Sequence, residues 1–216
     1  MFDKSEIENQ VAEFLLQIKA IKLQPNNPFT WASGWKSPIY CDNRITLSHP
    51  TIRTYIRQQL TRLIQEVFGA VGCIAGVATA GIPQGALVAQ ELGLPFIYVR
   101  SKPKDHGTGS LIEGEILTGK RVVVIEDLIS TGKSSLQAVE ALRSAGYDVA
   151  GLAAIFTYGF DIAADNFKQA NCPFVTLSNY NALIKYAAEN QYISENDIHV
   201  LKNWRENPAE WGKELS

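Results

Sequence analysis

Residues 121–134 read RVVVIEDLISTGKS, and this stretch decides the fold. Its run Val122-Val123-Val124-Ile125 is apolar on both faces, as expected of a central parallel strand that is covered on both sides. We therefore predict a strand over Arg121–Asp127 and a helix over Ser134–Ala145, joined by a short loop. The strand ends in Glu126-Asp127, so two carboxylates stand at its carboxyl end, which is where ligands bind in open α/β sheets.

The rest of the chain repeats this alternation of short apolar runs and helical patterns. The predicted strands are Cys73–Ala78, Pro95–Arg100, Val149–Thr157 and Phe174–Leu177, and the predicted helices are Gln84–Leu92 and Asn181–Asn190. Two earlier helices are predicted, one capped by Ser5 and one running from Ser48 to Gly69. The pattern predicts an α/β fold with a mostly parallel sheet flanked by helices, in a single domain over residues 1–216.

Composition narrows the class of protein. Hydrophobic residues make up 46% of the chain and the net charge is -2, whereas general nucleic-acid binders and membrane-surface proteins are more basic. The most apolar stretch, Val67–Ile82, is interrupted by glycines and is shorter than the ~20 residues that a membrane-spanning helix needs. The three cysteines form no CxxC pair and the charged start resembles no signal peptide, so we expect a cytoplasmic protein.

The loop after the 121–127 strand has the chemistry of a phosphate site. Its residues are Leu128, Ile129, Ser130, Thr131, Gly132, Lys133 and Ser134. Backbone N–H groups at the start of a helix bind phosphate, and the hydroxyl side chains add donors. A nucleotide-triphosphate P-loop would need a glycine where Asp127 stands, so we reject that interpretation. A sugar phosphate fits better, because carboxylates accept hydrogen bonds from ribose hydroxyls; the alternative is a surface acidic pair beside an ordinary helix.

Residues 122–134 resemble the phosphoribosyl-pyrophosphate (PRPP) signature of the type I phosphoribosyltransferase family. Gly76–Pro83 is also similar to that family, and two segments resemble its orotate-specific members: Arg100–Gly107, similar to their mobile catalytic loop, and Phe29–Tyr40, similar to their orotate-side segment. The resemblance implies that residues 1–47 partly form a small N-terminal hood over the base site.

The resemblance also implies an activity. The protein would be a pentosyltransferase that moves the phosphoribosyl group of PRPP to orotate, giving orotidine 5′-monophosphate and pyrophosphate in pyrimidine (UMP) biosynthesis. Mg²⁺ would be held mainly by PRPP rather than by a protein cage. A homodimer would share the loop at 100–109 between its active sites. Two alternatives are a phosphoribosyltransferase for another base and a PRPP-sensing regulator, although the acidic N-terminal helix offers no DNA-binding face.

The resemblance assigns roles to particular residues. The catalytic candidates are Lys104, His106 and Asp127, and the PRPP-binding candidates are Arg100, Lys102, Lys104, His106, Glu126, Asp127, residues 128–134, Ala80 and Gly81. The cations of the 100–109 segment would cover the departing pyrophosphate as a lid; a solvated basic loop is the alternative. Some orotate enzymes carry lysines where this chain has Ala32, Ala80 and Ser101, and Lys36 and Lys102 are candidates to replace them.

Orotate is flat and carries a carboxylate, so its pocket needs an aromatic face and a cation. The candidates are Tyr40, Arg44 and Lys36, with Ser130 reaching over from the PRPP loop. Core packing of Tyr40 and a surface salt bridge of Arg44 are the alternatives.

Overall fold

A computed structural model describes residues 4–31, 33–102 and 110–212. The chain forms two compact units, Met1–His49 with Ser178–Ser216, here called the terminal unit, and Pro50–Leu177, called the sheet unit. The single domain expected over residues 1–216 stays a prediction.

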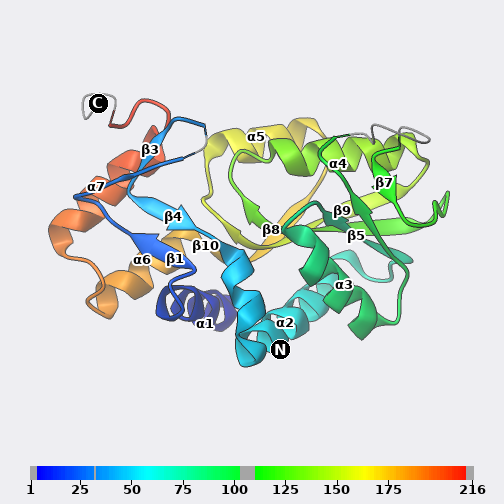
Figure 1. The fold of residues 1–216 in the computed structure, drawn as a ribbon, viewed down its shortest axis with the longest axis horizontal. Helices are drawn as coiled ribbons and strands as arrows, with labels where there is room; N and C mark the ends of the chain where they lie inside the picture. Colours follow the sequence, from blue (N-terminus) through cyan, green and yellow to red (C-terminus); the bar gives the residue numbers. More distant parts are fainter. Residues whose placement is uncertain (1–3, 32, 103–109, 213–216) are drawn as a thin grey trace. The chain divides into compact units, whose positions relative to one another are not determined.

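The sheet unit is built on a six-stranded sheet (Figure 1). Its strand order is β10 (Phe174–Asn179), β9 (Asp148–Thr157), β8 (Arg121–Ile129), β5 (Cys73–Val77), β6 (Phe96–Val99) and β7 (Ile112–Glu113). The β9–β8, β8–β5 and β5–β6 pairs are parallel, whereas β7 lies antiparallel to β6. The predicted α/β fold with a mostly parallel sheet is therefore confirmed.

Helices cover both faces of this sheet. Helices α2 (Pro50–Phe68) and α3 (Gly81–Leu92) lie on one face, and α4 (Lys133–Ser144) and α5 (Asp161–Gln169) lie on the other (Figure 1). All four side chains of Val122–Ile125 are fully buried, as the apolar run predicts. Val122 and Val124 share one core cluster with residues of α4 and α5, because alternate strand residues point to the same face.

The start of α3 approaches the sheet closely. A Cβ atom on Gly76 of β5 would lie 2.8 Å from the carbonyl oxygen of Gly81. The absence of a side chain at this position lets α3 begin directly against the strand, and so fixes where its first turn lies.

The main departure from prediction near the site concerns the end of β8. The strand continues two residues beyond Asp127, and Leu128 and Ile129 pair with Phe156 and Thr157 of β9. The expectation that Leu128 and Ile129 belong to the loop is therefore wrong. Pairing with a long neighbouring strand extends β8, and the loop between β8 and α4 is residues 130–132, here called the phosphate loop.

The terminal unit contains small strands and four helices among its described residues. They are α1 (Lys4–Gln17), β1 (Ile21–Leu23), β2 (Phe29–Thr30), β3 (Lys36–Ser37), β4 (Ile39–Cys41), the 3-10 helix η1 (Asn43–Ser48), α6 (Tyr180–Glu189) and α7 (Glu195–Glu206). β1 pairs with β4 and β2 with β3, both antiparallel. Fully buried Trp204 packs edge-on against Trp31, at a ring-centroid distance of 5.7 Å. This contact of α7 with the residue after β2 thus ties the C-terminal segment to the N-terminal strands.

Two predicted helix starts shift. Ser5, the predicted cap, lies inside α1 and not before it. The helix expected from Ser48 begins two residues later, at Pro50, a residue suited to the first helical position, because η1 ends at Ser48. Within the described ranges, no helix combines the length and apolar character needed to cross a membrane.

Candidate functional site

Three neighbouring parallel strands end at the same edge of the sheet, and each is followed by predicted site residues. β8 leads through the phosphate loop into α4, and β5 leads through Ala80 into α3 at Gly81. β6 ends at Val99, immediately before Arg100. Parallel pairing therefore gathers these three segments, which are far apart in the sequence, at one edge.

The phosphate loop and α4 form a cavity of about 310 Å³. Its lining is Leu128, Ser130, Thr131, Gly132, Lys133, Ser134, Ser135 and Gln137. Six of these residues are among the predicted PRPP-binding candidates. Gly132 is the N-cap of α4, and it has no side chain with which to cap the first turn of this helix. The N–H groups of that turn are therefore available to an anion, at the positive end of the helix dipole.

Gly132 has a backbone conformation that explains the sharp turn from strand to helix. Its φ is +79°, in the left-handed region that residues with a side chain adopt at a cost. A Cβ atom here would also lie 2.6 Å from Cε2 of Phe167 on α5. Glycine is thus required both by the turn and by the packing.

The two carboxylates of Glu126-Asp127 lie in different environments. Glu126 is 5% exposed, while Asp127 is half-buried. The Asp127 N–H donates to Oε1 of Glu126 at 3.0 Å, and the Ser135 hydroxyl donates to Oε2 at 3.4 Å. Burial, and then the charge of Asp127, raise the pKa of Glu126 well above its ordinary range. Glu126 therefore keeps its proton to higher pH than an exposed glutamate.

The start of α3 lies beside this acidic strand. Ala80 is the N-cap residue of α3, and a Cβ atom on Gly81 would lie 3.4 Å from Cα of Glu126. The predicted PRPP-binding positions Ala80 and Gly81 are thus next to the carboxyl end of β8.

Arg100 stands where β6 meets the segment predicted to be a lid. Its Nη1 lies 3.4 Å from Oε1 of Glu113, and its side chain lines a second cavity of about 640 Å³. Ser134 and Gln137 line both cavities, so the larger one adjoins the phosphate loop. Lys102 is exposed. Lys104 and His106 lie outside the described residues, so their catalytic roles stay predictions.

The orotate candidates other than Ser130 lie in the terminal unit. Tyr40 on β4 is 39% exposed, and its ring centroid is 5.5 Å from that of Phe29. Tyr40 is therefore not a core residue, which removes the alternative of core packing. Lys36 Nζ donates to the Thr30 hydroxyl at 3.1 Å, across the β2–β3 pair.

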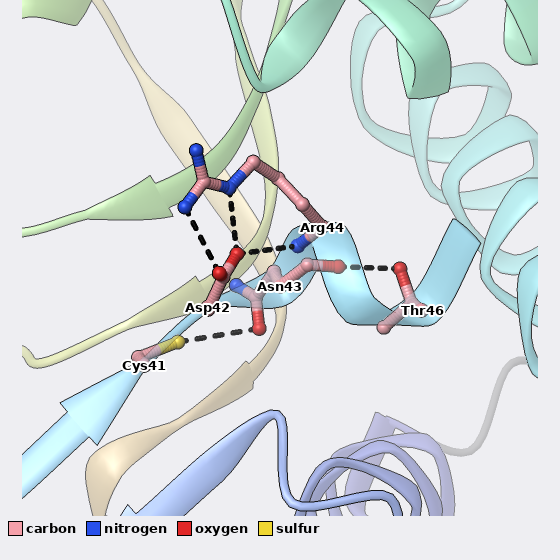
Figure 2. Close-up of polar contacts among 5 residues, drawn as sticks. All are labelled: Cys41, Asp42, Asn43, Arg44 and Thr46. Atoms are coloured by element: carbon pink, nitrogen blue, oxygen red, sulfur yellow. Dashed lines mark hydrogen bonds and ion pairs between the residues drawn. The ribbon is translucent and has the colours of Figure 1, made fainter. Parts of the chain in front are cut away.

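Arg44 is held by Asp42 in a two-point ion pair (Figure 2). Nε donates to Oδ1 at 2.7 Å and Nη2 to Oδ2 at 2.9 Å, and Oδ1 also accepts the Arg44 backbone N–H. The Arg44 hydrogen bond is the main cause that lowers the pKa of Asp42. The salt bridge considered for Arg44 is therefore present, but it is made within the same turn and leaves the arginine side chain 58% exposed.

The turn that carries Arg44 is itself well fixed. Asn43 is buried; its side-chain oxygen accepts from the Cys41 thiol at 3.2 Å and its carbonyl accepts from the Thr46 hydroxyl at 2.6 Å (Figure 2). Such a turn can present an arginine to a ligand with little loss of side-chain freedom.

The described ranges bear on how a metal ion could be held. No group of three or more His, Cys, Asp and Glu side chains in these ranges could hold one. The carboxylate oxygens of Glu126 and Asp127 are of the kind that Mg²⁺ prefers, and they would be joined by oxygen atoms of a bound substrate.

Sequence reasoning missed two residues that line the smaller cavity. Ser135 and Gln137 lie in the first turns of α4, after the stretch that carries the motif. Helical spacing offered a signal, because Gln137 follows Ser134 by three residues and so lies on the same side of the helix.

Comparison with known proteins agrees with this geometry. Residues 47–189 match the family model of the phosphoribosyl transferase domain. The orotate phosphoribosyltransferase of Phocaeicola vulgatus is 61% identical over 205 residues, covering 95% of this chain and 97% of that protein. The chain belongs to the orotate phosphoribosyltransferase family. Another orotate phosphoribosyltransferase, from Listeria innocua, is 56% identical and covers 96% of this chain and 99% of its own.

Solved structures of orotate phosphoribosyltransferases share the fold. The crystal structure of the Aeropyrum pernix orotate phosphoribosyltransferase matches with a TM-score of 0.73 at 28% identity, covering 85% of this chain and 99% of that one. The resemblance drawn from the motifs is thereby confirmed. The roles assigned to individual site residues stay predictions.

Proposed function

We propose that this chain is an enzyme that transfers the 5-phosphoribosyl group of PRPP to orotate, releasing pyrophosphate and forming orotidine 5′-monophosphate. This places the enzyme in pyrimidine nucleotide synthesis. The observation that carries the proposal is the phosphate loop at the end of β8, two residues after Glu126-Asp127, in a chain 61% identical to an orotate phosphoribosyltransferase.

The residues of the sheet edge suggest how the substrate PRPP is bound. The 5′-phosphate would lie against the first turn of α4, where it accepts hydrogen bonds from backbone N–H groups and the Ser130, Thr131 and Ser134 hydroxyls. Glu126 and Asp127 would bind the ribose hydroxyls. Because Glu126 retains its proton more readily, it can donate as well as accept a hydrogen bond there.

The reaction exchanges one bond at the anomeric carbon for another. A ring nitrogen of orotate forms the new bond and gives up its proton to water. The bond to pyrophosphate breaks with its electron pair leaving on the pyrophosphate oxygen. Positive charge that develops on the ribose is stabilised by Asp127, and cations of the 100–109 segment stabilise the leaving group. Lys104 or His106 would supply a proton to pyrophosphate.

Mg²⁺ fits this site as a partner of PRPP. When bound with PRPP, it would supply positive charge that neutralises the leaving group. Asp127 is half-buried at the strand end and is the protein carboxylate best suited to face it. The orotate carboxylate would pair with Arg44 or Lys36, its ring would lie on Tyr40, and Ser130 would contact the base.

We infer further that the enzyme is a cytoplasmic homodimer in which the 100–109 segment serves the partner's site. Mixing Lys104→Ala subunits with Asp127→Asn subunits tests this sharing. Each homodimer should be nearly inactive. In a hybrid dimer one of the two sites has both residues intact, so the mixture should regain about a quarter to a half of the parent activity, depending on the share of hybrids that form. Hybrids that form but show no recovery would contradict a shared loop.

The function itself is tested by following orotate absorbance with PRPP and Mg²⁺. Loss of orotate that requires both additions is expected, with uracil and hypoxanthine as control acceptors. Asp127→Asn should lower turnover by about 10²-fold or more, as loss of a charge-stabilising group does. A parent enzyme that consumes only a purine base would overturn the proposal.

A further inference from the structure

The phosphate loop is held in place by residues that lie outside its own motif. Nδ2 of Asn166, on α5, donates a hydrogen bond of 3.0 Å to the carbonyl oxygen of Thr131, 35 residues earlier in the chain. The acceptor is a carbonyl, so the Asn166 amide must present its NH₂ group at this contact. Asn166 is half-buried and α5 is nine residues long, so the contact is part of the folded sheet unit.

Two neighbouring contacts support the same loop. The Phe167 ring, 2% exposed, lies against Gly132 so closely that a Cβ there would be 2.6 Å from its Cε2. The Thr157 hydroxyl at the end of β9 donates to the carbonyl of Ile129 at 3.2 Å. The loop thus has its peptide groups fixed from the side of α5 and β9.

Peptide geometry connects this support to phosphate binding. The carbonyl of Thr131 and the N–H of Gly132 belong to one planar trans peptide, so they point in opposite directions. Because Asn166 holds the carbonyl toward α5, the Gly132 N–H points away from α5. The cavity of about 310 Å³ is lined by residues of β8, the phosphate loop and α4 and by none of the described residues of α5, so it lies on the side to which a donor directed away from α5 can point.

We propose that Asn166 is a positioning residue for the phosphate site, acting through the Thr131–Gly132 peptide. This inference rests on the proposed function, because it assigns the cavity to the 5′-phosphate of PRPP. Asn166 itself does not contact the substrate. It sets the direction of a backbone donor that would otherwise rotate with the loop.

The test uses an uncharged variant that removes the NH₂ group of the Asn166 side chain without greatly changing the size of that side chain. Asn166→Leu should raise the KM for PRPP about tenfold and leave the KM for orotate within about twofold, because one anion-binding N–H is no longer directed. Asn166→Gln keeps an NH₂ group on a longer arm and should recover part of the loss. The matched control is Gln169→Leu, which also replaces an amide side chain by leucine but at an exposed position of α5, and it should leave both constants unchanged.

Binding of ribose 5-phosphate to the full chain supplies a readout that needs no turnover. Asn166→Leu should weaken its affinity about tenfold, and the Gly132 amide signal in NMR spectra, which shifts when ribose 5-phosphate binds the parent, should shift less in the variant. Unchanged ribose 5-phosphate affinity in Asn166→Leu would overturn the inference, as would an equal rise in both KM values, which marks a merely structural role. A parent that binds ribose 5-phosphate but does not consume orotate would overturn the proposed function instead.

Discussion

Replacing Gly132 by alanine tests whether the turn between β8 and α4 depends on packing against α5. The substitution has two separable effects. A residue with a side chain at φ +79° costs about 1–2 kcal/mol. The new methyl group would also meet the Phe167 ring at 2.6 Å, and overpacking of this kind typically costs about 1–3 kcal/mol. Gly132→Ala should therefore lower the free energy of unfolding by about 2–5 kcal/mol.

Gly119 provides a matched control for the backbone part of this effect. Its φ is +78°, and a Cβ atom there would meet nothing within 4 Å. Gly119→Ala should thus show the backbone cost of about 1–2 kcal/mol alone. The gain from a stiffer unfolded chain is the same in both variants and cancels in the difference. The difference of about 1–3 kcal/mol belongs to the contact with Phe167.

The ring has little room to move away from a methyl group at position 132. Phe167 is buried, and its ring centroid is 4.5 Å from that of Phe174. Phe167→Leu should therefore cost less stability in the Gly132→Ala background than it costs alone. In a double-mutant cycle the two substitutions should be less harmful together than the sum of their separate effects, by about 1–2 kcal/mol.

Urea denaturation followed by far-UV circular dichroism is the appropriate assay. All four tryptophans lie in the terminal unit, so tryptophan fluorescence would report on that unit rather than on the sheet unit that carries the substitution. Equal stability of Gly132→Ala and Gly119→Ala would refute the packing argument. Strict additivity in the cycle would show that the ring and the loop do not interact.

Two further substitutions address the buried carboxyl and a distant structural contact. Burial raises the pKa of Glu126 in the folded state above its value of ~4.3 in the unfolded chain. Between the unfolded and the folded pKa the folded state therefore binds more protons than the unfolded chain, so the contribution of Glu126 to stability falls as the pH rises through this range. Glu126→Gln should lack that fall, and so gain stability relative to the parent toward neutral pH in a pH series of urea denaturations, while turnover drops; a parallel pH dependence in both proteins would contradict it. Tyr147→Phe removes the hydroxyl that accepts the Leu117 N–H at 2.8 Å and should lower the free energy of unfolding by about 1–3 kcal/mol. Both KM values should stay unchanged, because Tyr147 lies just before the start of β9, at the amino ends of the parallel strands, whereas the candidate site lies at their carboxyl ends. A changed KM for PRPP in that variant would show coupling between the two ends of the strands.

Much of the sheet unit could be predicted because its strands are continuous apolar runs. The Val122–Ile125 run is buried on both faces, and a short run of this kind is typical of a central strand in a parallel sheet. The helices α3 and α4 likewise follow from periodic apolar residues between glycines and caps.

The elements that escaped prediction are those fixed by distant partners. α5 has two buried residues, Ala163 and Phe167, which is too little to produce a periodic signal, and its place depends on packing against the Phe174 ring. The strands β2, β3 and β7 are two residues long, and pairing across the chain defines them. The extra length of β8 has the same origin, since it follows from the register with β9.

Distant partners also decide a property of the candidate site that the sequence could not predict, namely the difference between the two acidic residues that the motif presents as a pair. Glu126 and Asp127 are adjacent in the sequence, but the fold around them buries them to different extents. One carboxyl is therefore buried with the Ser135 hydroxyl against it, and the other stays half-buried. Because burial opposes ionisation of Glu126, the negative charge opposite a developing positive ribose falls mainly to Asp127 on the proposed mechanism. Asp127→Asn should then reduce turnover more than Glu126→Gln, although the motif alone gives no reason to rank them.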